Sequence, residues 1–191
     1  MLDVFRTFDE NFFLFLNAQH NTFLDPLMWL FSNKLFWGPF YVLVLWLLYK
    51  RYPKQYWTVL VAILVMIFAS DQICNLFKES VLRFRPTHEP HLEGLIHTLN
   101  GYKGGTYGFY SAHASNSFAL AFFALSATMW KNKYLAITAL LYASLTAYSR
   151  IYLGVHYPGD ILAGALMGAF IGTGVAYAHN KLRIRYLPAQ V

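Results

Sequence analysis

The chain has 191 residues, of which 57% are hydrophobic, 19% are aromatic and only 13% are charged. A water-soluble domain carries about 25% charged residues and about 45–50% apolar ones, so the composition favours a membrane protein, and the length fits a single domain over residues 1–191. The net charge of +6 comes from basic residues scattered beside apolar runs, without a block that would track nucleic acid; the expected partner is therefore the lipid bilayer, and nucleic acid is excluded.

Residues 1–20 carry an amphipathic helical pattern. Large apolar side chains recur at helical spacing, at Phe5, Phe8, Phe12, Phe15 and Leu16. The charged residues lie elsewhere on the turn, at Asp3, Arg6, Asp9 and Glu10. This pattern is typical of a helix that lies in the membrane interface, and the composition disfavours the alternative of a helix on a soluble core.

Residues 24–180 hold five apolar stretches, and a transmembrane helix needs about 20 predominantly apolar residues. The stretches cover residues 24–49, 55–77, 115–130, 134–148 and 159–178. The last one contains Gly164, Gly168 and Gly172 at four-residue spacing, which lets helices approach closely in lipid. We therefore predict an all-α integral membrane bundle of about five transmembrane helices, with the N-terminal amphipathic helix beside it.

Basic residues indicate how this bundle is oriented. They gather at alternate ends of the stretches, in residues 50–54, 131–133 and 181–185. Short basic loops favour the cytoplasm, so the loops 78–113 and 149–160 are expected together on the far side of the membrane, with the N-terminal helix. Those two loops are also cationic, so charge alone leaves the orientation open.

The far-side loops place three candidate phosphate-binding cations at the ends of apolar stretches. Lys78 shares one helix face with Asp71 and Asn75, and ionisable groups within a membrane usually face a protein interior or a water-filled cavity. Arg85 and Arg150 carry planar guanidinium groups that suit bidentate contacts with phosphate oxygens. Each cation alone would more often be a snorkelling or headgroup-contacting side chain, but the three together predict an anion site.

Two histidines predict acid–base or nucleophilic chemistry beside these cations. His156 precedes Asp160 by four residues, and a hydrogen bond between them would leave the second imidazole nitrogen free as a base or nucleophile. Asp160 also suits the N-cap of the helix that follows. His113 would act as a general acid near the start of the next helix, where Ser111 and the amides of Ser111, Ala112 and His113 would face an anion.

Two other features are interpreted without a catalytic role. The Gly-rich residues 104–108 lack the Gly-Lys-Ser/Thr ending of a phosphate loop and predict a flexible loop. Possible metal ligands lie in the same region, at His88, Glu89, His91, Glu93 and His97. Their spacing matches no familiar metal site, and Cys74 is the only cysteine, so neither a metal nor a cofactor is predicted.

Three groups of these residues resemble the signature of the type 2 phosphatidic acid phosphatase superfamily, over residues 55–180. The groups are Lys78 with Arg85-Pro86, Ser111 with His113, and Ser149-Arg150 with His156 and Asp160. The middle motif usually reads Pro-Ser-Gly-His in that family and reads Tyr110-Ser111-Ala112-His113 here. The resemblance implies a helical bundle that crosses a bacterial-type inner (cell) membrane several times, with its active site on the extracytoplasmic side.

The resemblance also implies a metal-independent reaction through a phosphohistidine. His156 would attack phosphorus while Asp160 orients it, and His113 would protonate the leaving lipid oxygen. The phosphoryl oxygens would be held by Lys78, Arg85, Ser111, Ala112 and Arg150. Water would then hydrolyse the intermediate.

The sequence therefore predicts a membrane lipid phosphatase whose partner is a phospholipid or an isoprenoid phosphate. Undecaprenyl pyrophosphate, phosphatidylglycerophosphate, phosphatidic acid, diacylglycerol pyrophosphate and the phosphates of lipid A all remain candidate substrates. The alternative is a membrane transporter or channel for an anionic solute. It is disfavoured because the paired repeats and interrupted helices common in transporters are not visible. The sequence leaves the oligomeric state open.

Overall fold

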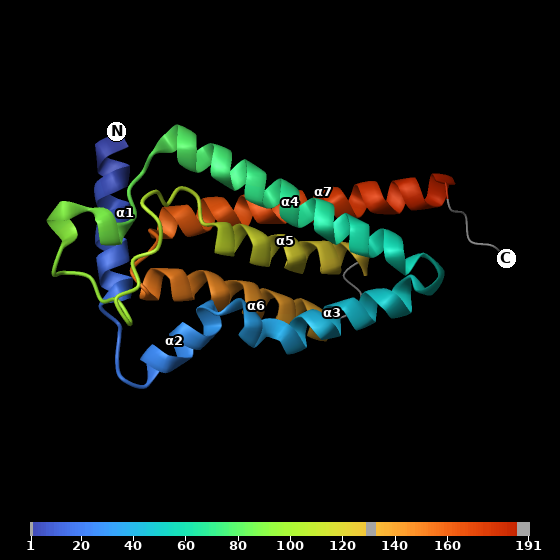
Figure 1. The fold of residues 1–191 in the computed structure, drawn as a ribbon, viewed down its shortest axis with the longest axis horizontal. Helices are drawn as coiled ribbons and strands as arrows, with labels where there is room; N and C mark the ends of the chain where they lie inside the picture. Colours follow the sequence, from blue (N-terminus) through green and yellow to red (C-terminus); the bar gives the residue numbers. More distant parts are fainter. Residues whose placement is uncertain (1, 129–132, 187–191) are drawn as a thin grey trace.

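A computed structural model describes residues 2–128 and 133–186, and within these ranges the fold is helical (Figure 1). The helices are α1 (Leu2–Asn17), α2 (Leu24–Ser32), α3 (Gly38–Arg51), α4 (Tyr56–Val81), α5 (Ala112–Ala127), α6 (Lys133–Tyr152) and α7 (Pro158–Tyr186). Short 3-10 turns lie between them, at Lys34–Trp37, Pro53–Gln55, Pro86–His88 and Pro90–Leu92. These ranges contain no strand, only an isolated antiparallel bridge between Phe84 and Tyr107. The all-α prediction is confirmed.

Helix α5 occupies the centre of the bundle. It packs closely against α7 and also contacts α4 and α6. Most of its buried residues are Ala or Ser, whose small side chains let neighbouring helices come close. Figure 1 shows the helices from α3 to α7 extended along the long axis of the molecule, with α1 lying across one end.

The glycines of α7 permit this close packing. A methyl group at Gly168 would overlap the carbonyl of Ser115. One at Gly172 would overlap the carbonyl of Ala119, and Gly164 approaches the start of α5 in the same way. The packing predicted for this glycine stripe is confirmed, and it holds the start of α7 beside the start of α5.

Two of the described helical segments are long and apolar enough to cross a membrane, Pro53–Val81 and Pro158–Arg185. Helices α2 and α3 pass the same test only as a pair, and they are bent by 77° at the break around Asn33. The stretch predicted as one span over residues 24–49 is therefore not one straight helix. The physical reason is that Asn33 is extended and its side chain accepts a hydrogen bond from the Leu35 amide at 2.9 Å.

The remaining predicted stretches coincide with α5, α6 and α7, but their ends differ. Helix α5 begins at Ala112 rather than at residue 115, and α7 continues to Tyr186 rather than ending at residue 178. The predicted end of the third stretch and the basic residues 131–132 lie outside the described residues. Apolar helices of membrane-spanning length are thus present, while the count of five spans stays a prediction.

Helix α1 has two distinct faces. Phe13 is fully buried on the inner face, beside Leu92 and Tyr157. The side-chain amide of Asn17 donates hydrogen bonds to two backbone carbonyls at the end of α6. Leu16 also packs inward, whereas the aromatic side chains of the outer face are exposed, at Phe5, Phe8, Phe12 and Phe15. The placement of this outer face in a membrane interface stays a prediction.

Candidate active site

The two polar loops predicted from the sequence meet at the end of the bundle where α1 lies (Figure 1). The loop between α4 and α5 is closed by two backbone hydrogen bonds. The Arg85 amide donates to the Thr106 carbonyl at 3.0 Å, and the Gly108 amide donates to the Arg83 carbonyl at 2.9 Å. This pairing holds Arg85 against the loop between α6 and α7, where His156 is only 1% exposed.

His156 is fixed through both of its ring nitrogens. Its Nδ1 atom lies 3.3 Å from Oδ2 of Asp160, and its Nε2 atom lies 3.2 Å from Nη1 of Arg85. A guanidinium group can only donate hydrogen bonds, so we assign the lone pair to Nε2 and the proton to Nδ1, which donates to Asp160. The unprotonated nitrogen therefore faces the arginine.

The surroundings of His156 keep its imidazole neutral. Burial lowers the pKa of His156 well below its ordinary value, and the positive charges of Arg85, Arg150 and Lys78 lower it further. A neutral ring has the lone pair that nucleophilic attack needs. The same three side chains are the cations predicted to bind phosphate, so all three lie within electrostatic range of this ring.

Arg85 and Arg150 are themselves buried cations. Arg85 donates to two carbonyls of the surrounding loops, while Arg150 donates to the Tyr102 hydroxyl at 3.0 Å and to the Ser32 hydroxyl. Burial and the charge of Arg150 lower the pKa of Arg85. Within the described ranges neither arginine forms a salt bridge with a carboxylate. A phosphate between the two would relieve their mutual repulsion.

Ser111 joins the start of α5 to the start of α7. Its hydroxyl accepts a hydrogen bond from the Ala114 amide as the N-cap of α5. Its own amide donates to the backbone carbonyl of Asp160 at 3.1 Å, so this N–H is already satisfied. Ala112, the first helical residue, has no positive φ, which means that alanine fits this position without backbone strain. The donors left for an anion are the Ser111 hydroxyl and the amides of Ala112 and His113, since the Ala114 amide is already bound to Ser111.

His113 reaches the same region from the first turn of α5. It lines a cavity of about 210 Å³ together with Arg150 and Tyr102, and it interacts electrostatically with Arg150. Lys78 lies in the last turn of α4, half-buried and within electrostatic range of His156. The structure thus brings together, at one end of the bundle, site residues that the sequence separates by more than 70 positions.

Arg83 is a site residue that the sequence analysis missed. Its Nη1 atom donates to Oδ1 of Asp160 at 2.9 Å, and its Nη2 atom donates to Oδ2 of Asp9 at 2.8 Å. Asp9 also accepts a 2.7 Å hydrogen bond from the Gly159 amide, in the first turn of α7. Arg83 and Asp9 therefore hold the carboxylate that orients His156. In the sequence, the one feature that could have indicated Arg83 is its position two residues before Arg85 of the first motif.

Two glycines of the loop predicted to be flexible pack directly on the site. A methyl group at Gly108 would lie 3.1 Å from Cγ of Arg85 and 3.2 Å from Oδ2 of Asp160. Gly104 has a φ of +69°, and a methyl group there would lie 2.9 Å from Nη1 of Arg85. The Gly-rich residues 104–108 therefore let the backbone pack closely on Arg85. The sequence analysis predicted only a flexible loop here and did not predict this role.

The possible metal ligands of the same loop are used in separate contacts. His91 lies 3.0 Å from Glu10 and 3.7 Å from Glu89, while His97 lies 2.9 Å from Asp25. Among the described residues, no three His, Cys, Asp or Glu side chains are arranged to hold a metal ion. These contacts instead connect the loop to α1 and α2.

Known proteins resemble this chain in sequence. The PAP2 superfamily matches residues 55–184. A lipid A 4'-phosphatase from Bacteroides thetaiotaomicron is 37% identical over 191 residues, which cover 97% of this chain and 83% of that protein. A lipid A 4'-phosphatase from Porphyromonas gingivalis is 35% identical over 183 residues, which cover 95% of this chain and 77% of that protein.

Solved structures resemble it in fold. The crystal structure of a transmembrane PAP2 type phosphatidylglycerolphosphate phosphatase from Bacillus subtilis superimposes with a TM-score of 0.71 at 22% identity, covering 94% of this chain and 88% of that chain. Aquifex aeolicus LpxE superimposes with a TM-score of 0.67 at 23% identity, covering 87% of this chain and 93% of that chain.

Fold, motifs and relatives together define a membrane-embedded lipid phosphatase, an enzyme rather than a carrier. The chain belongs to the PAP2 superfamily. The matched residues 55–184 contain all three signature motifs, whereas Asp9 and Ser32, which contact site residues, lie before the match.

Proposed function

We propose that this enzyme removes phosphate from a membrane lipid through a phosphohistidine at His156. Nε2 attacks the phosphorus atom, and Asp160 stabilises the imidazolium ion that forms. His113 donates a proton to the lipid oxygen as its bond to phosphorus breaks. His113, now neutral, then takes a proton from water, whose oxygen attacks the phosphohistidine. Inorganic phosphate leaves and His156 is restored.

The observation that carries this proposal is the direction of Nε2 toward Arg85. The nitrogen assigned as the nucleophile lies 3.2 Å from a guanidinium group, so a phosphoryl group attacked there would place an oxygen on Arg85. Arg150 and Lys78 lie close enough to share the charge that develops in the transition state. The Ser111 hydroxyl and the Ala112 amide would complete the set of ligands.

We also propose that the active-site end faces the extracytoplasmic side of a bacterial-type inner membrane. The opposite end of the bundle carries basic residues, among them Lys50 and Arg51 of α3 and Arg183 and Arg185 of α7, which suits the cytoplasmic side. Five crossings would follow from α4, α5, α6, α7 and the bent pair α2–α3. Helix α1 would lie in the outer interface with its exposed phenylalanines in lipid.

Lipid A is the substrate that should be tested first. Both relatives reported above are named lipid A 4'-phosphatases, and each aligns with at least 95% of this chain. The wider set of relatives includes an undecaprenyl-diphosphatase and a phosphatidylglycerophosphatase, so these lipids form the comparison panel.

The test is phosphate release by purified protein in detergent with a chelator present. We expect release by the wild type, loss in His156→Gln, and a base-stable, acid-labile phosphoryl group on the wild type that His156→Gln cannot form. His88→Gln is the matched control, because His88 lies in the neighbouring loop and, among the described residues, its side chain is hydrogen-bonded to Thr87 and to no group of the site. Release that persists in His156→Gln would overturn the proposal.

A further inference from the structure

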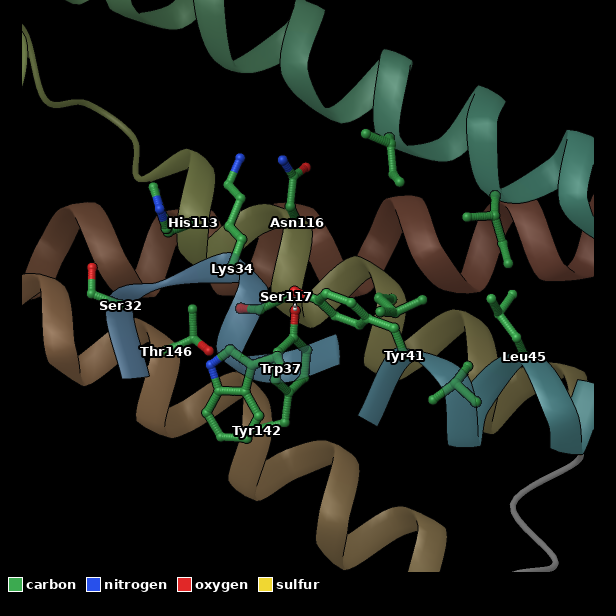
Figure 2. Close-up of a pocket in the computed structure, with 14 residues that line it drawn as sticks. Ser32, Lys34, Trp37, Tyr41, Leu45, His113, Asn116, Ser117, Tyr142 and Thr146 are labelled. Carbon is green, nitrogen blue, oxygen red and sulfur yellow. Dashed lines mark hydrogen bonds between the residues drawn. The ribbon is translucent and has the colours of Figure 1, made fainter. Parts of the chain in front are cut away.

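A second cavity adjoins the active site on the far side of His113. It has a volume of about 310 Å³ and lies between α3, α4, α5 and α6 (Figure 2). Most of its wall is apolar, with Val44, Leu45 and Ile63 among the residues that line it. Figure 2 shows Leu45 at the end of the cavity away from His113. A hydrocarbon chain suits such a wall.

His113 is shared between this cavity and the smaller one that is lined by Arg150. It lines both, as does Ser32, whereas Arg150 lines only the smaller, polar cavity. A general acid must stand beside the oxygen that leaves. The scissile phosphoryl group would therefore lie on the arginine side of His113, and the leaving group on the side of the apolar cavity.

One exposed cation, Lys34, lines the apolar cavity. Lys34 is the one charged Lys, Arg, Asp or Glu side chain among the described residues that line it, and it interacts electrostatically with His113. Lys34 is exposed, and no carboxylate in residues 2–128 or 133–186 forms a salt bridge with it. Figure 2 shows Lys34, Asn116 and His113 along one edge of the cavity.

Two uncharged polar atoms of the wall have no hydrogen-bond partner among residues 2–128 and 133–186. The side-chain oxygen of Asn116 is buried without a hydrogen bond, while its amide donates to Asp71 at 2.8 Å. The hydroxyl of Thr146 is likewise without a partner, in a residue that is only 6% exposed. A buried polar atom normally has a hydrogen-bond partner, so these atoms point to a ligand with polar atoms at this place.

We propose that Lys34 binds a second phosphate group, one that belongs to the leaving group, so that this enzyme favours lipids whose leaving group is itself anionic. The inference rests on the proposed function. Three cations already serve the scissile phosphoryl group, and Lys34 lies on the other side of the general acid. Hydroxyl groups of the leaving group would meet Asn116 and Thr146, which can bond to them but carry no charge.

Matched lipids with one and with two anionic groups test this inference. Phosphatidic acid has a neutral leaving group, diacylglycerol pyrophosphate has a phosphate on the leaving oxygen, and phosphatidylglycerophosphate has a phosphodiester three carbons away. Lipid A with one or with two phosphates forms a fourth comparison. All are assayed for phosphate release with wild type, Lys34→Gln, Lys34→Arg and the control Lys103→Gln, which removes an exposed lysine of the loop at the same end of the bundle.

We expect Lys34→Gln to lower kcat/KM about tenfold, or about 1.4 kcal/mol, for lipids with a second anion. Phosphatidic acid and singly phosphorylated lipid A should change by less than about twofold, since they offer Lys34 no charge. Lys34→Arg should restore most of the rate, and Lys103→Gln should match the wild type. A fall for the pyrophosphate alone or the phosphodiester alone would identify which second anion is bound.

Equal loss on all lipids, or no loss on any, would overturn the inference while leaving the proposed function intact. The proposed function is judged separately, by whether the wild type releases phosphate that His156→Gln does not. If the wild type releases phosphate from none of these lipids, the proposed function fails and this inference fails with it.

Discussion

Replacing Arg83 by Gln tests whether the catalytic carboxylate depends on a partner outside the signature motifs. Arg83 donates at 2.9 Å to Asp160, which is fully buried, and at 2.8 Å to Asp9. A hydrogen bond to a charged group contributes about 1.5–3 kcal/mol. If lost from the transition state, that energy corresponds to about a ten- to hundredfold fall in kcat. Because Arg83 is bonded to these two carboxylates and is assigned no contact with the phosphate, KM should change by less than about twofold.

The assay is steady-state phosphate release on the best lipid, with kcat and KM determined separately. Asp9→Asn should lower kcat less than Arg83→Gln, and the two effects should not add in the double variant, because both residues belong to one network. Arg6→Gln is the control. Arg6, on α1, also forms a salt bridge, but its partner is Glu89 and not Asp160. An increase in KM with kcat unchanged, or full activity in Arg83→Gln, would refute the reasoning.

Three other outcomes follow from the structure. Gly168→Val should lower the midpoint of thermal unfolding in detergent by several degrees, since the added carbons would overlap the backbone of α5; Gly174→Val, at a glycine with open space, should not. Gly108→Ala should lower kcat without unfolding the protein, because its methyl group would press on Arg85 and on the carboxylate that orients His156. Because the folded-state pKa of His156 is lowered, unfolded protein takes up a proton below about pH 6.5 before the folded protein does. The midpoint temperature of thermal unfolding should therefore decrease as the pH is lowered from 7 to 5, and it should decrease less in His156→Gln. An identical pH dependence in wild type and variant would contradict the lowered pKa of His156.

The sequence revealed the parts of the site that are local in the chain. His156 and Asp160 are four residues apart, so their pairing followed from spacing, and the charge types of Arg85 and Arg150 indicated an anion. It was silent on Arg83 because the partner Asp9 lies 74 residues away, and no local pattern connects the two. A basic residue near the membrane surface also commonly snorkels or contacts lipid headgroups, so its type alone does not identify it as a site residue.

The average hydropathy of residues 24–49 did not reveal that this stretch is bent. Residues 24–49 are apolar enough to predict one span, but the polar run Ser32-Asn33-Lys34 interrupts helical hydrogen bonding and the two halves are bent by 77°. The bend matters for the site, since it places Ser32 on Arg150 and Lys34 at the cavity beside His113. Close helix packing at the glycine stripe of α7 was easier to foresee, because glycine at four-residue spacing has few other uses in a membrane helix, although the sequence did not identify α5 as the partner.

The residues before the family match therefore complete the active site in two different ways. Asp9 contacts Arg83 and the Gly159 amide, and Arg83 contacts the carboxylate that we propose orients His156; such a contact would serve any substrate. Lys34 lines the cavity that we assign to the leaving group, and in that role it would distinguish one substrate from another. Catalysis and selectivity could then change independently: the cations that we propose bind the phosphoryl group lie within residues 55–184, while the cation that we assign to the leaving group lies on the bent segment before them.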